Sequence, residues 1–259
     1  IRRERLLALR LARRADAVVV PSRATGGDVE RLGHVDPARI HVIPHGVAAA
    51  YAPAPEAAVA RLRARLGLGD RRYLLAVGTL DERKRRDTLA ATVALVRRDA
   101  DVALVVAGDQ GVYTPLVAAA LEREGVRPAT TLAGHVTEAD LVTLYTGAAA
   151  LVFPTAYEGF GLPVLEALAC GTRVACFDNS SLPEVAGDAA ETVPDADTPA
   201  LARAVGRILA EGDATRAERI AAGRARAAEF TWERSARAHL AVYDAVEARD
   251  RARPASRRG

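Results

Sequence analysis

Residues 149–171, AALVFPTAYEGFGLPVLEALACG, are the stretch that decides the fold. The apolar run at 149–153 is typical of a buried parallel strand. Pro163 suits the first position of a helix, and Gly171 stands where a helix ends in a left-handed cap. Between them, Gly159 and Gly161 allow the backbone to approach a ligand closely. The stretch therefore predicts a strand, a glycine-rich loop and a helix whose N-terminus favours a phosphate group.

Two carboxylates bracket this loop. Glu158 precedes the glycines, and Glu166 follows on the predicted helix. Carboxylates accept hydrogen bonds from vicinal hydroxyls, so both could hold a sugar while backbone N–H groups hold a diphosphate. The alternative is that Glu166 is a first-turn glutamate favoured by the helix dipole and Glu158 a solvated loop residue. The surrounding glycines, prolines and strand favour a nucleotide-sugar site.

The rest of the chain alternates strands with helices. Strands are predicted at 73–77, 102–107, 130–133, 149–153, 173–177 and 191–193. Helices are predicted between them at 83–97, 114–124, 138–145, 163–170 and around 182–185. This alternation predicts an α/β fold with a doubly wound, Rossmann-like parallel sheet. Ligands of such sheets bind where the strands end, so the loops that follow the strands are expected to meet at one edge.

Residues 154–175, PTAYEGFGLPVLEALACGTRVA, resemble the E-x7-E signature of the retaining group 1 (family 4) glycosyltransferases, and residues 180–190 resemble its usual continuation. The resemblance extends from about Ala15 to Tyr243 and implies the C-terminal half of a GT-B type enzyme. It implies that Glu158 and Glu166 hold the donor sugar and the ribose hydroxyls. The backbone that would engage the sugar and the diphosphate belongs to Gly159, Phe160, Gly161, Leu162 and Pro163.

A basic loop, GTLDERKRRD at 78–87, follows the first strand of the alternating region. A flexible glycine followed by four consecutive cations at a helix start suits a diphosphate, although a solvated basic helix face is the alternative. The loop resembles the family's diphosphate-binding loop, with Gly78 as its glycine. Lys84 matches the phosphate-binding lysine, Arg83 is its neighbour, and Thr79 stands where many members carry arginine. Arg83, Lys84 and Glu158 are therefore the predicted catalytic residues.

Gly134, His135 and Val136 follow a later strand, where members of the family commonly contact the nucleobase through backbone groups. The alternative for the His135 side chain is that it has no role in binding and is an ordinary loop histidine. The turn Gly108-Asp109-Gln110-Gly111 is predicted to be structural. Asp195-Ala196-Asp197 is a D-x-D triplet that would bind a divalent metal in another glycosyltransferase class. Here it precedes a helix start, so turn and capping propensity explain it, and no metal is expected.

Three parts are expected from the resemblance. Residues 1–50 would be the tail end of an N-terminal acceptor domain and the interdomain linker. Residues 51–230 would be the nucleotide-sugar-binding domain, and residues 231–259 a crossover helix with a basic tail. Because the chain contains no methionine, Ile1 is not expected to be the native start, and most of the acceptor domain is expected to be missing.

The composition of the chain limits the kinds of partner and location that can be expected. With 36 basic and 33 acidic residues the net charge is only +3, which does not indicate a nucleic-acid surface. No apolar run reaches the length of a membrane span, and no signal peptide is visible. Cys170 and Cys176 match no zinc spacing and are predicted to be reduced core thiols. The expected location is cytoplasmic, with peripheral membrane contact through the missing domain as an option.

The predicted function is transfer of a sugar, with retention, from a nucleotide sugar to a glycan, lipid or other acceptor. The loops at 45–47 and 78–80 resemble those of mannosyl- and rhamnosyl-transferring members, which favours GDP-mannose, while UDP- and dTDP-sugars remain open. No cofactor is expected besides the nucleotide-sugar co-substrate. One alternative is a nucleotide-sugar-binding module that is inactive without an acceptor domain. A second is a sugar-nucleotide epimerase of the same architecture, which the E-x7-E stretch disfavours.

Overall fold

The computed structural model describes residues 2–252, with side chains from residue 7 onward. The chain forms two compact units. One contains residues 47–229, and the other combines residues up to Gly46 with those from Phe230 onward. The predicted basic tail beyond residue 252 lies outside the described residues. Within the described part, no helix combines the length and apolar character that a membrane-spanning helix needs.

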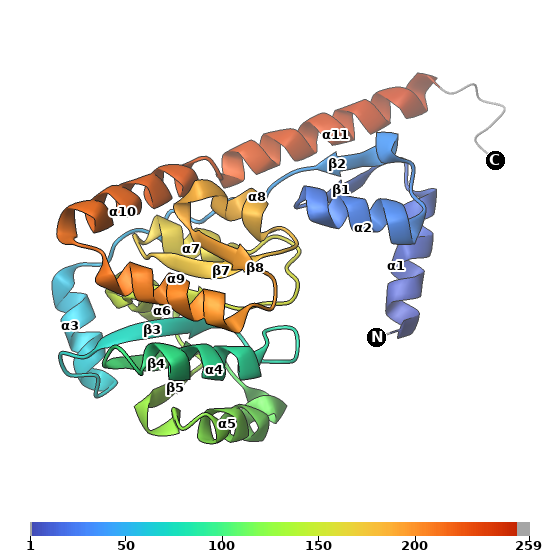
Figure 1. Ribbon diagram of the computed structural model, residues 1–259. Helices are drawn as coiled ribbons and strands as arrows, with labels where there is room; N and C mark the ends of the chain where they lie inside the picture. Colours follow the sequence, from blue (N-terminus) through green and yellow to red (C-terminus); the bar gives the residue numbers. More distant parts are fainter. Residues whose placement is uncertain (1, 253–259) are drawn as a thin grey trace. The chain divides into compact units, whose positions relative to one another are not determined.

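The larger unit, residues 47–229, is built on a six-stranded parallel sheet with the order β5-β4-β3-β6-β7-β8 (Figure 1). Its strands are β3 (Arg72–Val77), β4 (Val102–Ala107), β5 (Thr130–Gly134), β6 (Ala150–Phe153), β7 (Val174–Asp178) and β8 (Glu191–Pro194). Its helices are α3 (Glu56–Arg65), α4 (Arg86–Val96), α5 (Thr114–Arg123), α6 (Glu138–Gly147), α7 (Leu162–Ala169), α8 (Leu182–Ala186), α9 (Thr198–Ala210) and α10 (Asp213–Ala228). The predicted Rossmann-like parallel sheet is confirmed.

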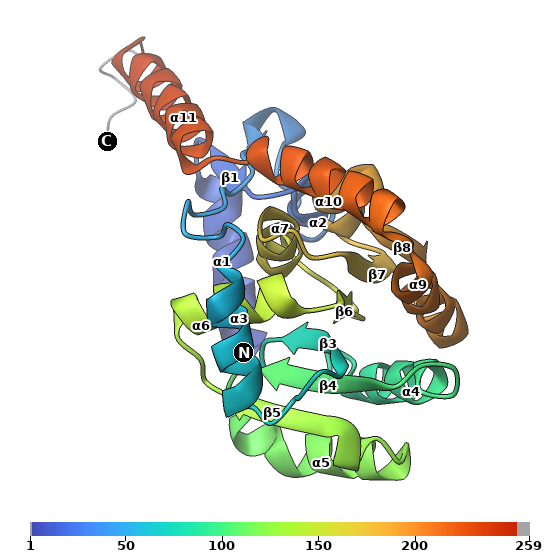
Figure 2. The ribbon, with the colours of Figure 1, turned by 90° about the vertical axis from the view of Figure 1, so that its left-hand side faces the viewer.

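Helices cover both faces of this sheet (Figure 2). On one face α9 contacts β6, β7, β8 and α4, and α4 contacts α5. On the other face α6 and α7 contact the strands, α3 packs on α6, and α10 packs on α7. Alternate strand residues such as Leu74, Leu104 and Phe177 join Leu89 and Leu201 of the first face in one buried cluster. Strands buried on both faces must be apolar throughout, which is why the sequence pattern located them closely.

Helix α4 begins later than predicted. It starts at Arg86, so Arg83 and Lys84 lie in the preceding turn and not in the helix. The Asp81 carboxylate accepts a hydrogen bond from the Lys84 backbone N–H at 2.9 Å and fixes that turn. Arg85 adopts a left-handed conformation (φ 47°), which a right-handed helix cannot include. Arg83 and Lys84 are therefore loop residues, and the predicted basic start of the helix is reduced to Arg86.

The smaller unit contains α1 (Arg2–Arg14), β1 (Val18–Val20), α2 (Arg23–Gly33), β2 (Ile40–Val42) and α11 (Trp232–Ala252). β1 and β2 form a two-stranded parallel sheet. Ser22 caps α2, because its hydroxyl accepts a hydrogen bond from the Thr25 N–H at 3.1 Å. Gly46 packs directly against the backbone at Trp232, where an added Cβ would lie 2.2 Å from the Trp232 nitrogen. The close approach of these two segments therefore requires glycine at position 46.

Candidate functional site

The site lies where the order of the strands reverses. β3 pairs with β4 on one side and with β6 on the other, so the loops after β3 and β6 leave the sheet beside each other and continue to opposite faces. This switch point is the usual ligand position in open parallel sheets. The loop after β3 contains Gly78 to Arg85, and the loop after β6 contains Pro154 to Gly161. The sequence therefore brings its basic loop and its first carboxylate to the same edge of the sheet.

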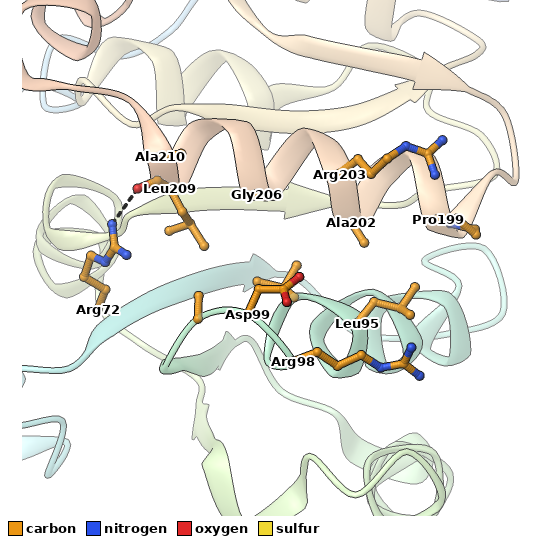
Figure 3. Close-up of a pocket in the computed structure, with 12 residues that line it drawn as sticks. Arg72, Leu95, Arg98, Asp99, Pro199, Ala202, Arg203, Gly206, Leu209 and Ala210 are labelled. Carbon is orange, nitrogen blue, oxygen red and sulfur yellow. Dashed lines mark hydrogen bonds between the residues drawn. The ribbon is translucent and has the colours of Figure 1, made fainter.

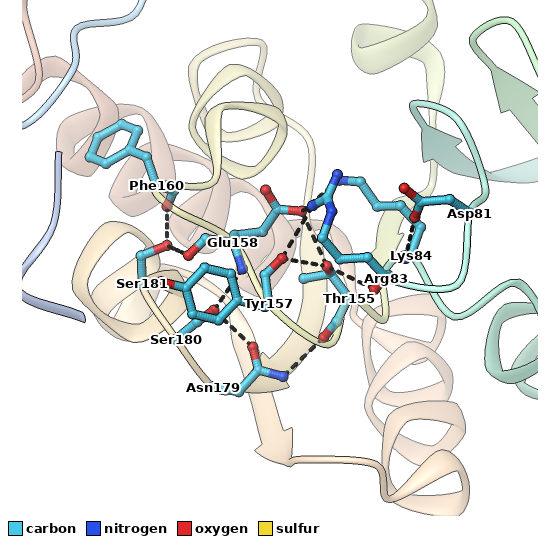
Figure 4. A network of polar contacts seen from close by, with 10 residues as sticks. All are labelled: Asp81, Arg83, Lys84, Thr155, Tyr157, Glu158, Phe160, Asn179, Ser180 and Ser181. Atoms are coloured by element: carbon cyan, nitrogen blue, oxygen red, sulfur yellow. Dashed lines mark hydrogen bonds and ion pairs between the residues drawn. The ribbon is translucent and has the colours of Figure 1, made fainter. Parts of the chain in front are cut away.

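A single carboxylate oxygen joins the two loops (Figure 4). Oε1 of Glu158 lies 2.5 Å from an Arg83 guanidinium nitrogen and 2.7 Å from Nζ of Lys84. The Thr155 hydroxyl lies 3.1 Å from the same oxygen. The Ala156 N–H also donates to the Arg83 carbonyl at 2.8 Å, so backbone and side chains both fix the spacing of the loops. The predicted catalytic residues Arg83, Lys84 and Glu158 thus form one cluster.

The two cations differ in their surroundings. The Lys84 side chain is 9% exposed, whereas that of Arg83 is 45% exposed. Lys84 Nζ lies 4.0 Å from the centre of the Phe153 ring, an arrangement that stabilises a cation. Burial lowers the pKa of Lys84 below its ordinary value, while the negative charge of Glu158 opposes that shift. Lys84 is thus a desolvated cation held by one carboxylate, and Arg83 is the solvent-facing partner.

Glu166 lies in a different environment, on α7. The Tyr145 hydroxyl donates to its Oε2 at 2.9 Å, and the Tyr51 hydroxyl also interacts with this carboxylate. Burial raises the pKa of Glu166 above its ordinary value, although both hydroxyls favour the ionised form. Tyr145 comes from α6 and Tyr51 from the segment before α3. Neither tyrosine was predicted, because a buried helical tyrosine such as Tyr145 has the same sequence signature as any other core residue, and Tyr51 lies in a segment outside the helices and strands.

Glycines stand where β3, β4 and β5 end and shape the loops that follow. Gly78, Gly108 and Gly134 all have positive φ, and a Cβ on Gly108 would lie 2.9 Å from the Gly78 backbone. Gln110, which is buried, ties these loops together. Its Oε1 accepts from the Leu80 N–H at 2.7 Å, and its Nε2 donates to the carbonyls of Gly78 and Gly108. The predicted structural turn at 108–111 therefore braces the basic loop.

Ser181, which directly precedes α8, holds the loop before α7 through two of its backbone carbonyls. Gly161 has φ 106°, and α7 begins at Leu162 with Pro163 in its first turn. The buried Ser181 hydroxyl lies 2.7 Å from the Phe160 carbonyl and 2.9 Å from the Glu158 carbonyl. These contacts point the two carbonyls toward Ser181 (Figure 4). The first-turn N–H groups of α7 have no intrahelical acceptors, as at every helix start.

The remaining predicted donor residues occupy the same edge of the sheet. The Thr79 hydroxyl donates to the Asp109 carbonyl at 2.7 Å, so it braces its own loop. His135 is exposed and Val136 half-buried in the loop after β5. The D-x-D triplet follows β8, and its two aspartates make different contacts. Asp197 caps α9 by accepting from the Ala200 N–H at 2.8 Å, as predicted, but Asp195 forms an ion pair with Arg85 that turn propensity did not indicate.

A separate cavity of about 570 Å³ lies between α4 and α9 (Figure 3). Its lining includes Leu95 and Arg98 from the end of α4 and its following turn, Arg203 and Gly206 from α9, and Arg72 at the start of β3. Arg72 donates to the Leu209 carbonyl at 2.8 Å. None of the predicted donor-binding residues lines this cavity. The chemistry therefore gathers at the open loops after the strands, and not in this cavity.

The chain matches two family models. Residues 71–211 match the model described as Glycosyl transferases group 1, and residues 2–51 match the model described as Glycosyltransferase Family 4. The first match spans the whole switch-point site. It includes Arg83, Lys84, Glu158 and Glu166.

Curated relatives and solved structures agree with this assignment. The O-antigen chain mannosyltransferase B of Escherichia coli is 34% identical over 163 residues, covering 62% of this chain and 42% of that protein. The D-inositol 3-phosphate glycosyltransferase of Salinispora tropica is 34% identical, covering 92% of this chain and 53% of that protein. A sucrose-phosphate synthase from Thermosynechococcus elongatus superposes with a TM-score of 0.81 at 27% identity, covering 96% of this chain and 62% of that one.

The chain therefore spans about half the length of the curated relatives that it matches. Its parallel sheet corresponds to one part of those longer glycosyltransferases, as expected for the C-terminal half of a GT-B type fold. On the group 1 family match, which covers more than half of its residues, the chain belongs to the group 1 glycosyl transferases.

Proposed function

We propose that this chain supplies the donor site of a retaining glycosyltransferase, which transfers a sugar from a nucleotide sugar to a glycan, lipid or other acceptor. The observation that carries the proposal is the junction of Glu158 with Arg83 and Lys84 across the switch point. A carboxylate suited to sugar hydroxyls and two cations suited to phosphates meet there at hydrogen-bonding distance. Nothing in the core of the sheet requires such a cluster.

The cations are assigned to the diphosphate. As the bond to the sugar breaks, negative charge grows on the leaving phosphate, and prearranged cations stabilise that charge. Phosphate oxygens compete with Oε1 of Glu158 for Arg83 and Lys84, so donor binding would replace one anionic partner with another. Because Lys84 is already desolvated, its charge acts strongly on any phosphate that reaches it. In this assignment the cations perform the neutralisation that a metal performs in other classes.

The two carboxylates are assigned to different parts of the donor. Within the described residues, Oε1 of Glu158 carries the side-chain hydrogen bonds, and Oε2 faces away from them, available to a sugar hydroxyl. Glu166 is assigned to the ribose hydroxyls. On binding, a ribose hydroxyl would replace a tyrosine hydroxyl at its carboxylate or donate to it alongside that hydroxyl. Backbone of Gly134, His135 and Val136 is assigned to the base. The loop from Gly159 to Pro163 is assigned to the sugar and the diphosphate.

GDP-mannose is the favoured donor. The loops at 45–47 and 78–80 resemble those of mannosyl- and rhamnosyl-transferring members, and one relative that matches the chain is named a mannosyltransferase. UDP- and dTDP-sugars are the competing donors.

Calorimetric titration of the chain with GDP, UDP, dTDP and GDP-mannose, with EDTA and then with magnesium, tests the proposal. We expect one nucleotide to bind in EDTA and Lys84→Ala to abolish that binding. Arg98→Ala, which removes an exposed cation from the turn after α4, is the matched control and should bind as the parent does. A folded chain that binds none of these nucleotides would contradict the proposal. Binding without release of the nucleoside diphosphate in the presence of lipid and glycan acceptors would instead fit the binding-module alternative.

A further inference from the structure

Asp195 forms a bidentate ion pair with a residue far away in the sequence. Its two carboxylate oxygens accept from the Arg85 guanidinium at 2.7 and 3.1 Å. Arg85 directly follows Lys84 at the end of the loop after β3, whereas Asp195 directly follows β8. The guanidinium carbon also lies 5.2 Å from the centre of the Phe177 ring. The pair therefore connects the basic loop after β3 to the segment after β8.

From Asp195 the contacts continue to the carboxylate loop. The Asn179 side-chain amide donates to Asp195 at 2.6 Å and to the Thr155 carbonyl at 2.9 Å. Its oxygen accepts from the Ser180 hydroxyl at 3.0 Å, and that hydroxyl accepts from the Glu158 N–H at 3.0 Å. Figure 4 shows Asn179 and Ser180 on the side of the loop opposite the cations. A continuous set of hydrogen bonds thus links Arg85 to the backbone of Glu158.

The backbone supports a functional interpretation of these contacts. Arg85 (φ 47°) and Ser180 (φ 48°) are both non-glycine residues in the left-handed region. Such conformations persist where surrounding contacts hold them, and they gather at functional sites. Here the two residues stand at opposite ends of the same hydrogen-bonded set.

We propose that Arg85, Asp195, Asn179 and Ser180 form a clasp that sets the position of Glu158 relative to Arg83 and Lys84, with Asp195 as its central positioning residue. The functional part of this inference rests on the proposed donor site. The clasp contacts neither the side-chain nitrogen atoms of Arg83 and Lys84 nor the Glu158 carboxylate. It acts through the backbone, at Arg85 next to Lys84 and at the Glu158 N–H. Because Oε1 of Glu158 faces Arg83 and Lys84 at once, a small movement of either loop would alter both contacts.

The ion pair itself is too exposed to contribute much to folding. The Asp195 side chain is 43% exposed and the Arg85 side chain 21% exposed, and pairs at such positions add little to stability. Loss of Asp195 should therefore loosen the loops without unfolding the unit. This separates a positioning role from a merely structural one.

Asp197 provides a matched control from the same triplet. It has the same side chain two positions away, but it caps α9 and makes none of the clasp contacts. Asp195→Ala and Asp197→Ala would be compared by hydrogen exchange of residues 156–161 and by thermal melting. We expect Asp195→Ala to raise exchange in that loop on the order of 10-fold, including the Glu158 amide, with little change in Tm. Asp197→Ala should lower Tm and leave exchange at 156–161 unchanged.

Two further variants test whether the residues act together. Asp195→Asn keeps an oxygen acceptor for Asn179 and Arg85, so its exchange should lie between those of the parent and Asp195→Ala. Arg85→Asn keeps a residue type that tolerates positive φ but removes the guanidinium. If the clasp is one unit, the Arg85→Asn/Asp195→Ala double variant should exchange no faster than the faster single variant. Additive effects, or unchanged exchange in Asp195→Ala, would overturn the clasp.

Titration of the same variants with GDP, UDP and dTDP separates the clasp from the proposed function. Nucleotide binding by the parent chain that weakens on the order of 10-fold in Asp195→Ala, but not in Asp197→Ala, supports the positioning role. Equal binding by the parent and Asp195→Ala overturns that role and leaves the donor-site proposal standing. If the parent chain binds no nucleotide, the donor site fails and with it the functional role, while the exchange result still decides whether the clasp positions Glu158.

Discussion

Glu158 and Glu166 are the same residue type, eight positions apart in one motif, yet the structure gives them opposite surroundings. Glu158 lies in a loop between two cations, and its side chain is 13% exposed. Glu166 lies on a helix, where tyrosine hydroxyls replace cations as its partners and burial raises its pKa. The spacing places Glu158 in the loop after β6 and Glu166 on α7, and tertiary contacts give the two carboxylates their different partners.

The two glutamates therefore differ in which property of the carboxylate matters: its negative charge or its hydrogen-bond acceptors. At Glu158 the negative charge matters, because it compensates a buried ammonium group that would otherwise stand alone. At Glu166 the hydrogen-bond acceptors matter, because no cation within residues 7–252 donates to it and burial already disfavours its charge. Replacing each glutamate by glutamine, which removes the charge and retains one oxygen, therefore tests the two sites differently.

The largest effect is expected from Glu158→Gln on stability. The substitution leaves Lys84 desolvated without its carboxylate, and breaking a buried pair from one side costs about 3 kcal/mol. Urea unfolding followed by circular dichroism measures this loss. Glu82→Gln, at an exposed glutamate in the same basic loop, is the control and should change the unfolding free energy by less than about 0.5 kcal/mol. Equal effects of the two substitutions would show that the Lys84–Glu158 pair contributes nothing to folding.

A second prediction concerns which part of the donor each glutamate reads. If Glu166 holds the ribose, Glu166→Ala should weaken binding of the preferred nucleoside diphosphate roughly 10- to 100-fold, the value of hydrogen bonds to a charged group. Glu158→Gln should not weaken binding of that nucleotide, because its assigned contact is the sugar and its charge competes with the phosphates for Arg83 and Lys84. Calorimetry with the nucleoside diphosphate and then with its nucleotide sugar distinguishes the two. A nucleoside diphosphate that responds equally to both substitutions would refute the division of roles.

The sequence predicted the sheet well because its physical signal is local. Strand 102–107 is apolar at every position, and it was predicted with the bounds that the structure shows. The start of α4 was misplaced because Arg85 has a left-handed backbone, and its guanidinium pairs with Asp195, 110 positions away in the sequence. Capping propensity correctly identified Asp197, since a cap involves only its own helix.

The candidate site was predicted in outline. Residues that meet through the parallel topology, such as Lys84 and Glu158, could be brought together by knowing that loops after parallel strands share an edge. The partners of Glu166 could not, because the pairing of Tyr145 with Glu166 depends on how α6 packs beside α7. A hydroxyl in a buried tyrosine leaves no mark on the apolar pattern of a helix.

The smallest expected effect is a change in the pH dependence of stability, and it has opposite signs at two carboxylates. Burial raises the pKa of Glu166 above 4.5, so its contribution to stability is full below that value and is lost as the pH rises through the folded pKa. Glu166→Gln should therefore gain stability relative to the parent as the pH rises. Hydrogen bonding to Arg85 lowers the pKa of Asp195 below 3.8, so its contribution is present above that value and is lost on acidification. Asp195→Asn should accordingly lose stability relative to the parent as the pH rises. Urea midpoints measured from about pH 2.5 to about pH 8 give both slopes, and slopes of the same sign would mean that burial does not dominate the titration of Glu166.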